Sequence, residues 1–444
     1  PNSWVTSWIK FAHAPPRPNL REGVDCVGKA WSHERNLPRA ETRFGDHCAA
    51  FNNKQSSDGS SNPNEGYGLN LNNLVLVQRI MAPPVATEAS TTTASDSSTP
   101  LITTDPNSDY PYKHLLPVYD NSKSYPPLEP FEHTDPASRA ATLPEAEQRA
   151  FLNNATRVRN LTPKLGTEVV GVDLTLLDEP ARDQLALEVA RRGVVVFRDQ
   201  PKFLAQTAEQ FREWGSYFGR LHIHPTSRHP ALIPELHLTY YDSNDGEFFH
   251  KLLRTHISTT KWHSDVSYEL QPPGLTAFFL LTQPSSGGGD TSFVSQVQAL
   301  KKLSPPFVEF LKTLKAVHSG VQQAQDSQGL WRDPVEHVHP VVRRHPVTRE
   351  EALYVNPMYT RYIVGLKKEE SDTILGFLYN HIACVADAQV RVSWEPNTVV
   401  LWDNRITAHT AIVDFAEPTE RRHGARITPQ AERPIPALES LDLS

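Results

Sequence analysis

Apolar residues in this chain fall mainly into short runs that are separated by turns rich in proline, glycine and polar residues. Short runs bounded in this way predict β-strands. The run from Val194 to Phe197 is apolar at every position, which indicates a strand buried on both faces. The other predicted strands are EVVGVDL (168–174), LHLTYY (236–241), LTAFFLLTQP (275–284), HPVVRRHP (339–346), ALYVNPM (352–358), QVRVSW (389–394) and TVVLWDNR (398–405).

Helical periodicity is confined to a few segments. Asp178-Glu179-Pro180 places acidic residues and a proline in a first helical turn, where both are favoured, and Gly193 supplies a stop. Between them, one face of the predicted helix carries Ala181, Leu185 and Val189.

Two further helices are predicted. Thr207 and Gln210 form a capping box, and Gly219 ends the helix that follows. Aromatic side chains line one side of that helix and are expected in the core: Phe211, Trp214 and Phe218. A third helix is predicted from about Lys368 to His381.

Many short strands and few helices, the latter mostly early in the chain, indicate a mainly β fold with flanking helices. The pattern favours an antiparallel double-sheet barrel of the jelly-roll kind, a double-stranded β-helix. We find no internal repeat.

The region before the strands has a different composition. Residues 1–80 are polar and turn-rich without sustained periodicity, and Met81 opens a run that resembles a natural N-terminus. We therefore interpret residues 1–80 as an upstream or dispensable extension, so a chain beginning at Met81 should keep full activity and melting temperature. Residues 81–109 are expected to form a disordered polar tail. One domain is predicted over 110–432, opening with an irregular strap over 110–136, and 433–444 form a C-terminal tail.

Composition excludes several classes of protein. The chain is 38% hydrophobic, which suffices for a core, and its net charge of -7 predicts no general attraction to nucleic acid or anionic membrane. No apolar run is long enough to span a membrane, and Lys10 and His13 interrupt the start as no signal peptide would, so a cytoplasmic location is expected. Three cysteines cannot build a disulfide framework, and the spacing around Cys26 and Cys48 matches no zinc finger.

The most informative polar motif is His263-Ser264-Asp265. Side chains at alternate positions of an extended backbone point the same way, so His263 and Asp265 can share one metal ion. A second histidine would complete the 2-His-1-carboxylate group of non-haem Fe(II) oxygenases. The structural alternative is a hydrogen-bonded pair at the end of a strand. The motif occurs again at 133–135, but there Pro136 and a turn-rich segment follow it, which argues against a metal site.

The far end of the chain supplies the missing groups. His409 follows a predicted strand and turn, and a barrel can bring it beside the H-x-D motif. Three arginines follow at 421, 422 and 426. They could bind a ligand inside the barrel, or they could be a run of charges on the surface. A planar guanidinium can hold a carboxylate such as that of 2-oxoglutarate through two hydrogen bonds, and the Thr291 hydroxyl can add a third. The glycines before Thr291 indicate a tight turn rather than a phosphate-binding loop.

Taken together, the motifs resemble one family. From about Tyr110 to Glu432 the chain is similar to the taurine dioxygenase family of Fe(II)- and 2-oxoglutarate-dependent oxygenases, most closely to its fungal sulfonate dioxygenase branch. The motifs that carry the resemblance are RGVVVFRDQ (192–200), HIHPTS (222–227), WHSDVSYELQPPG (262–274), GGDTSFVSQ (288–296), HPVVRRHP (339–346), ALYVNPMYTRYIVGL (352–366), WDNRITAHTAIVDF (402–415) and RRHGAR (421–426).

This resemblance implies a role for each site residue. Iron would be held by His263, Asp265 and His409, and 2-oxoglutarate by Thr291 and Arg422. Arg421 would replace Arg422 if the preceding loop differs in length. The resemblance assigns the sulfonate to His224, Arg426 and the backbone amide of Val266.

The implied reaction uses O2, with ascorbate as a supporting reductant, to hydroxylate the carbon next to a sulfonate. The products are sulfite and an aldehyde, which would scavenge sulfur from taurine-like organosulfonates. The alternatives are the same chemistry on another small anion, such as an alkyl sulfate, or a metal-binding jelly-roll module without turnover. A zinc hydrolase is disfavoured because we find no general base. No nucleic-acid or membrane partner is expected, and a homo-oligomer is left open.

Overall fold

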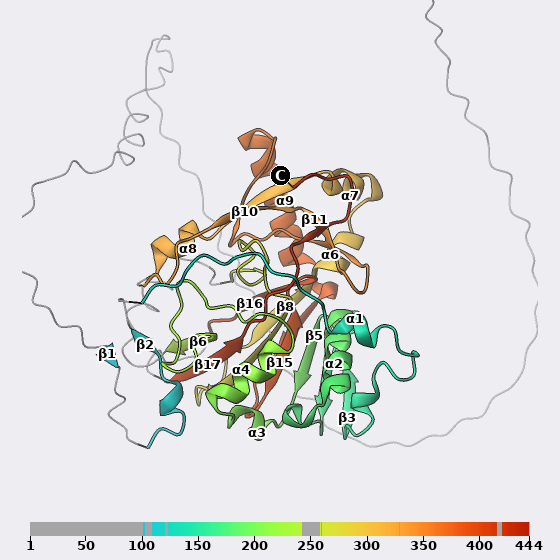
Figure 1. Ribbon diagram of the computed structural model, residues 1–444. Helices are drawn as coiled ribbons and strands as arrows, with labels where there is room; N and C mark the ends of the chain where they lie inside the picture. Colours follow the sequence, from blue (N-terminus) through green and yellow to red (C-terminus); the bar gives the residue numbers. More distant parts are fainter. Residues whose placement is uncertain are drawn as a thin grey trace, which may run out of the picture. The chain divides into compact units, whose positions relative to one another are not determined.

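The computed structural model (Figure 1) describes residues 101–102, 109–119, 123–241, 258, 260–327, 329–414 and 420–443. The chain divides into two compact units, Pro1–Thr92 and Thr93–Ser444, and all described residues belong to the second. The expectations for residues 1–80, for most of the polar tail and for Cys26 and Cys48 lie outside the described residues.

The largest element of the second unit is a seven-stranded sheet in which neighbours are antiparallel except for the parallel pair β4 and β5. Its centre is formed by strands far apart in sequence, since β15 lies between β5 and β7. In spatial order the strands are β3 (Arg157–Asn160), β4 (Thr167–Val170), β5 (Val194–Phe197), β15 (Val399–Asp403), β7 (Leu275–Thr282), β17 (Arg422–Ile427) and β6 (Leu236–Tyr241).

Four smaller sheets accompany it in the part of the chain that the structure describes. The sheet that matters most for the site places β8 (Thr291–Ser295) between β14 (Gln389–Val392) and β16 (Thr407–Ala411). A second small sheet has the spatial order β10 (Glu336–Pro340), β9 (Lys315–Ser319) and β13 (Thr360–Ile363). A third has the order β12 (Glu351–Leu353), β11 (Val342–Arg344) and β18 (Ile435–Pro436). The fourth pairs β1 (Leu101–Ile102) with β2 (Val118–Tyr119).

The helices predicted at Asp178 and Thr207 begin at those capping residues. The carboxylate of Asp178 accepts from the Ala181 N–H at 3.0 Å, and Thr207 and Gln210 make both hydrogen bonds of a capping box. Gly193 ends the helix that begins after Asp178, with φ +71°, a conformation that favours glycine. The described α-helices are α1 (Ala137–Ala140), α2 (Glu179–Arg192), α3 (Pro201–Leu204), α4 (Ala208–Ser216), α6 (Gln296–Lys301), α7 (Pro305–Lys312), α8 (Val321–Asp326) and α9 (Lys368–Cys384). Short 3-10 helices occur at Lys113–Leu115, Ala150–Leu152, Leu174–Leu176 and Ala386–Ala388.

Three expectations about these elements were wrong. Helices are not mostly early, because α6, α7, α8 and α9 all follow β8 in the second half of the chain. The segment 339–346 is not one strand: Pro340 ends β10, and Val341 donates to Leu314 O at 3.0 Å before β11 continues in a different sheet. ALYVNPM (352–358) contributes only its first residues to β12, after which a turn begins.

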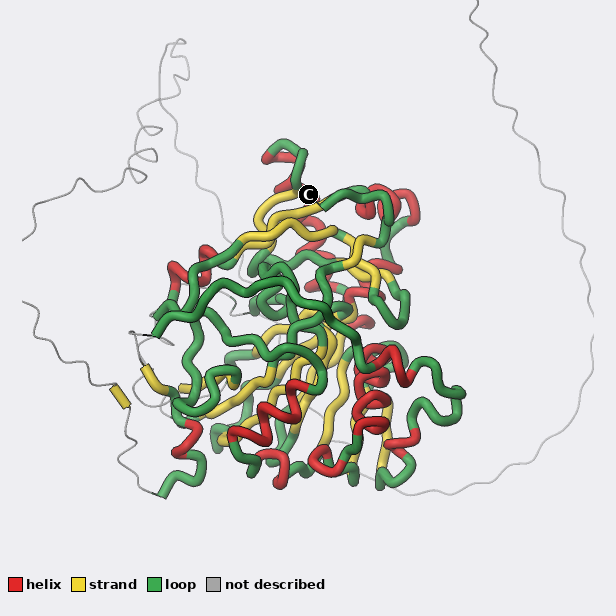
Figure 2. The backbone as a smooth tube through the Cα atoms, in the orientation of Figure 1, coloured by secondary structure: helices red, strands yellow, loops and turns green. Residues whose placement is uncertain are grey.

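The seven-stranded sheet is covered on both faces, which confirms the buried character predicted for β5. One face packs on α2, α3 and α4, where the ring of Phe279 stacks on Phe211 at 5.2 Å and meets Phe203 edge-on at 5.4 Å. Burying such a side chain contributes about 1.5–3 kcal/mol. The other face packs Phe278 and Trp402 against Phe293 of the β14–β8–β16 sheet. Figure 2 shows these strands close together and flanked by the helices.

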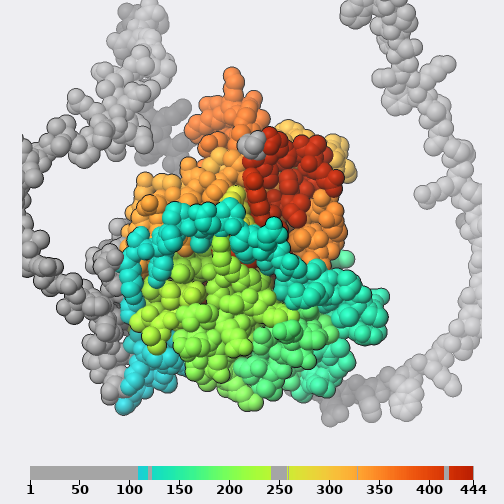
Figure 3. All heavy atoms as spheres, viewed as in Figure 1, coloured from blue at the N-terminus to red at the C-terminus, as the bar shows by residue number. Residues whose placement is uncertain are grey.

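The irregular strap crosses the outside of the domain, where Figure 3 shows it in teal as a band over other segments. Its residues 123–135 form neither helix nor strand. The strap is fixed by backbone and ring contacts: Tyr125 N–H donates to Trp331 O at 2.6 Å, and the Arg220 guanidinium lies 4.1 Å from the centre of the Phe131 ring. The Asp135 carboxylate at its end is buried against Arg405.

Candidate metal and anion site

Backbone hydrogen bonds join the two distant histidines of the predicted site. His263 and His409 form an antiparallel bridge in which each N–H donates to the other's carbonyl, at 2.9 and 2.8 Å. The Asn404 side chain, in the turn between β15 and β16, accepts from Asp265 N–H at 2.9 Å. Strand pairing and one amide therefore hold His263, Asp265 and His409 in register with one another.

The side chains of these three residues converge. Nε2 of His409 lies 3.5 Å and Nε2 of His263 lies 3.9 Å from Oδ1 of Asp265, and ligand atoms from all three lie within 4.8 Å of one another. Nδ1 of His263 bonds Lys261 O at 2.8 Å, which leaves Nε2 directed at the carboxylate. Oδ2 of Asp265 is buried and has no hydrogen-bond partner among the described residues. Two imidazoles and an unpartnered carboxylate oxygen fit a divalent metal such as Fe(II).

The charge states suit metal binding. Burial lowers the pKa of His409 to about 3 and lowers the pKa of His263, so both rings are neutral at pH 7 with a lone pair to offer. Burial raises the pKa of Asp265, but the Arg426 guanidinium and the two imidazoles outweigh it and hold the pKa at about 2. Two neutral nitrogens and one anionic oxygen therefore face one point.

A cavity of about 370 Å³ opens beside these residues. Six of the predicted site residues line it, whereas Asp265 and Val266 do not. The Val266 side chain packs with Tyr268 and Tyr359. Residues that line the cavity include His224, His237, His263, Phe278, Thr291, His409, Arg422 and Arg426.

Arg422 and Thr291 lie together at this cavity, whereas Arg421 does not line it. The Arg421 guanidinium lies over the Tyr110 ring, 4.2 Å from its centre. The Arg422 side chain is buried, with Nη2 donating to Gly289 O at 3.3 Å, and its Nε is unpartnered within the described part of the chain. A buried guanidinium with spare donors beside a hydroxyl matches the needs of a carboxylate ligand.

Arg426 sits between the metal group and a histidine that sequence reasoning missed. One end of its guanidinium donates to Asp265 Oδ1, and the other donates to Nδ1 of His237 at 2.5 Å. His237 belongs to LHLTYY (236–241), whose polar residues alternate with leucines. Because side chains of a strand alternate between its two faces, the sequence predicts that His237 points away from the face of the leucines. Its position beside Arg426 depends on the pairing of β6 with β17, which no local pattern reveals.

His224 also lies at the cavity, and its orientation is fixed. The backbone N–H groups of Thr226 and Ser227 donate to its Nδ1 at 3.2 and 3.1 Å. Its ring lies 4.5 Å from that of His237, centre to centre.

The second H-x-D copy is structural. Asp135 accepts from Ala137 N–H at 2.8 Å and pairs with Arg405 at 2.5 Å, so its carboxylate is already committed. Among the described residues, His263, Asp265 and His409 form the one group of three histidine, cysteine or acidic side chains whose ligand atoms lie close enough together to share a metal ion.

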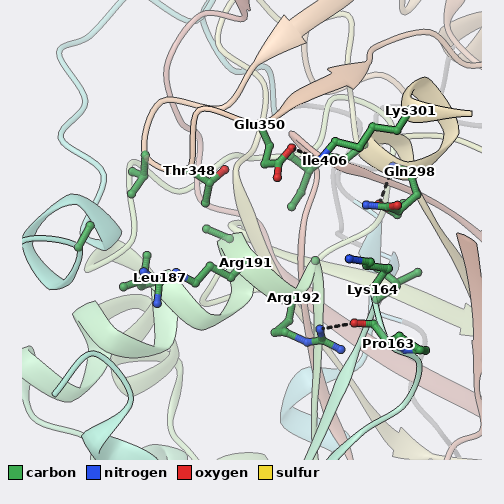
Figure 4. Close-up of a pocket in the computed structure, with 17 residues that line it drawn as sticks. Pro163, Lys164, Leu187, Arg191, Arg192, Gln298, Lys301, Thr348, Glu350 and Ile406 are labelled. Carbon is green, nitrogen blue, oxygen red and sulfur yellow. Dashed lines mark hydrogen bonds and ion pairs between the residues drawn. The ribbon is translucent and has the colours of Figure 1, made fainter. Parts of the chain in front are cut away.

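A larger cavity of about 630 Å³ lies elsewhere, beside the C-terminal end of α2 (Figure 4). Two of its cations already have partners: Arg192 donates to the carbonyls of Thr162, Pro163 and Gly166, and Lys301 pairs with Glu350 at 2.6 Å. Its volume exceeds that of the first cavity, but the group of potential metal ligands lies beside the smaller one, and so does the site chemistry.

No helix in the described ranges is long and apolar enough to cross a membrane.

The fold and the site are typical of one class of protein. Comparison with known proteins identifies that class. Residues 157–428 match the model of the family described as "Taurine catabolism dioxygenase TauD, TfdA family", and the chain belongs to this family, as the sequence motifs predicted.

Individual relatives are similar over most of their length. The chain is 46% identical over 339 residues to the alpha-ketoglutarate-dependent sulfonate dioxygenase of Saccharomyces cerevisiae, covering 74% of this chain and 80% of the relative. It is 43% identical over 338 residues to the alpha-ketoglutarate-dependent dioxygenase cnsP of Penicillium expansum, covering 73% and 88%. A crystal structure of a taurine dioxygenase from Burkholderia xenovorans matches with a TM-score of 0.51 at 30% identity, covering 64% of this chain and 93% of the other.

Proposed function

We propose that this chain is an Fe(II)- and 2-oxoglutarate-dependent dioxygenase that hydroxylates the carbon next to a sulfonate and thereby releases sulfite and an aldehyde. The observation that carries the proposal is the convergence of His263, Asp265 and His409 beside a cavity that also holds two buried arginines. Family membership and the named activity of the yeast relative support it.

The same proposal covers the fold. The seven-stranded sheet faces the β14–β8–β16 sheet across Phe278, Phe293 and Trp402, and the metal group lies where His263 bridges to β16. We interpret these two sheets as a double-stranded β-helix core, with α2, α3 and α4 packed outside it.

In this account the three ligands would hold iron, and Arg422 with Thr291 would hold the distal carboxylate of 2-oxoglutarate. When bound, iron with 2-oxoglutarate and O2 supplies the oxidising power that inserts one oxygen atom into a C–H bond, while 2-oxoglutarate becomes succinate and CO2. The hydroxylated carbon then loses sulfite, which leaves an aldehyde.

The protein's own contribution is to aim the substrate. A sulfonate spreads one negative charge over three oxygens, so a fixed cation and imidazole donors are suitable partners. Arg426 and His224 supply these at the cavity, and Arg426 also contacts the Asp265 carboxylate. One guanidinium thus links the anion subsite to the metal ligand and fixes the distance between the sulfonate and the reacting centre.

The test is a substrate panel. Purified protein with Fe(II), 2-oxoglutarate and ascorbate should form succinate when taurine or isethionate is added, together with sulfite. An alkyl sulfate that supports faster succinate formation would instead favour the sulfate-ester reading. Failure of every substrate and of every metal-loaded preparation to form succinate would favour a metal-binding module without turnover.

Replacing Arg422 with alanine should raise the apparent KM for 2-oxoglutarate by about 30-fold or more. The reason is that truncating one partner of a buried charge pair costs ~2 kcal/mol or more. The measurement is succinate formation against 2-oxoglutarate concentration at saturating sulfonate.

Arg421→Ala is the matched control, because Arg421 lies over the Tyr110 ring rather than at the cavity. Its KM for 2-oxoglutarate should stay close to that of the unmodified protein. A large rise for Arg421→Ala with none for Arg422→Ala would reverse the assignment.

A further inference from the structure

His237 has a place in the cavity that the proposed function leaves unexplained. It stands on β6 directly opposite Arg426 of β17 and lines the cavity beside His224. The two imidazole rings are 4.5 Å apart, so a single small anion can touch both.

The hydrogen bonds fix the tautomer of each ring. A guanidinium has donors only, so Nδ1 of His237 must accept the hydrogen bond from Arg426. Nδ1 of His224 likewise accepts from two backbone N–H groups. A neutral imidazole that accepts at Nδ1 carries its proton on Nε2, so both rings present an Nε2–H donor.

Both donors are available to a ligand. Among the described residues, neither Nε2 of His224 nor Nε2 of His237 has a hydrogen-bond partner, although both residues line the cavity. Burial and the charge of Arg426 lower the pKa of each ring well below its usual value, which keeps the rings neutral at pH 7.

We propose that His237 is a specificity-determining residue that donates its Nε2–H to one oxygen of the sulfonate, beside Arg426 and His224. The inference rests on the proposed function. Three donor groups match the three oxygens of a sulfonate, whereas a carboxylate or a sulfinate has only two oxygens. The arrangement therefore selects a head group with three acceptor oxygens over one with two.

An indirect role is the competing explanation, because His237 also accepts a hydrogen bond from Arg426 and so holds that guanidinium in place. Two amide substitutions separate the roles. His237→Asn keeps an acceptor near the position of Nδ1 but has no group near Nε2. His237→Gln places an amide N–H near the position of Nε2 but removes the acceptor at Nδ1.

The experiment is anaerobic calorimetric titration of protein loaded with Fe(II) and 2-oxoglutarate. Taurine is compared with hypotaurine, which has the same chain and a sulfinate with one oxygen fewer. The unmodified protein should bind taurine more tightly. His237→Asn should weaken taurine binding by about 10- to 100-fold, the range for one hydrogen bond to a charged group. It should weaken hypotaurine binding less, so that discrimination falls, while His237→Gln should retain the discrimination.

Controls distinguish the ways in which the idea can fail. His133→Asn, outside the cavity, should leave both affinities unchanged. If His237→Asn binds taurine as tightly as the unmodified protein while His237→Gln does not, His237 only positions Arg426 and the proposal is wrong. If neither change affects taurine binding, His237 does not contact the sulfonate. If the unmodified protein neither binds sulfonates nor releases sulfite, the proposed function itself fails.

Discussion

Replacing His263 with alanine is expected to abolish turnover and to weaken Fe(II) binding by more than about 100-fold. His263 offers Nε2 to the point that Asp265 and His409 share, and its Nδ1 bond to Lys261 O keeps it there. Even partners that only orient a metal ligand are worth about 10–100-fold in affinity, so removing a ligand should cost more. The measurements are anaerobic Fe(II) titration and succinate formation.

His133→Ala is the matched control, since it removes a histidine from the other H-x-D copy. Asp135 in that copy is engaged with Arg405, so no metal role is expected and both Fe(II) binding and turnover should be unchanged. Equal losses in the two variants would contradict the distinction between the two copies.

Replacing Arg405 with methionine is expected to cost about 3–5 kcal/mol in the free energy of unfolding at pH 7. Arg405 is 4% exposed and pairs with Asp403 at 2.6 Å, Asp135 at 2.5 Å and Glu432 at 3.3 Å. Removing one partner of a buried ionic group leaves the remaining charges buried without an opposite charge to pair with. The measurement is urea unfolding followed by circular dichroism.

The same variant should show a characteristic dependence on pH. In the unmodified protein, burial raises the pKa of Asp403, but Arg405 and His345 outweigh it and hold the pKa well below the usual value. That stabilisation is present above the unfolded pKa of a carboxyl group and is lost as pH falls through the folded pKa. Without Arg405, burial raises the pKa values of the carboxyl groups that it paired with. Protonation of these groups as pH falls removes their unpaired buried charge, which reduces the destabilisation of the variant. The stability difference should therefore be largest near pH 7 and smaller near pH 5.

Arg212→Met provides the comparison, because Arg212 forms a more exposed pair with Glu235 at 3.2 Å. Such pairs contribute about 0–1 kcal/mol. Equal losses in the free energy of unfolding for Arg212→Met and Arg405→Met would contradict the claim that burial makes the Arg405 ion pairs more important for stability.

Local chemistry made much of the fold predictable. Capping residues such as Asp178 and Thr207 fix helix starts through bonds within a few residues, and the apolar run Val194–Phe197 marks a strand covered on both faces. Helices α1, α3, α6, α7 and α8 were missed, although Pro305 in the first turn of α7 is a recognisable signal. The division of 339–346 between two sheets depends on tertiary pairing, which no local pattern contains.

The candidate site was also predictable only where local sequence patterns place its residues. Arg422 and Arg426 are four residues apart on β17, so the strand period places them on one face, and both line the cavity. That spacing alone could have favoured Arg422 over Arg421, which precedes the strand. His237 could not be placed in this way, because it reaches Arg426 only through the pairing of β6 with β17.

The most direct test of the account measures sulfite and succinate in the same reaction, with taurine, Fe(II), 2-oxoglutarate and air. The account predicts that both products form in equal amounts, that omitting Fe(II) abolishes both, and that omitting taurine abolishes sulfite and strongly slows succinate formation. Succinate formation at the same rate with or without any sulfonate, and with no sulfite released, would contradict the claim that this cavity directs oxidation to the carbon beside a sulfonate.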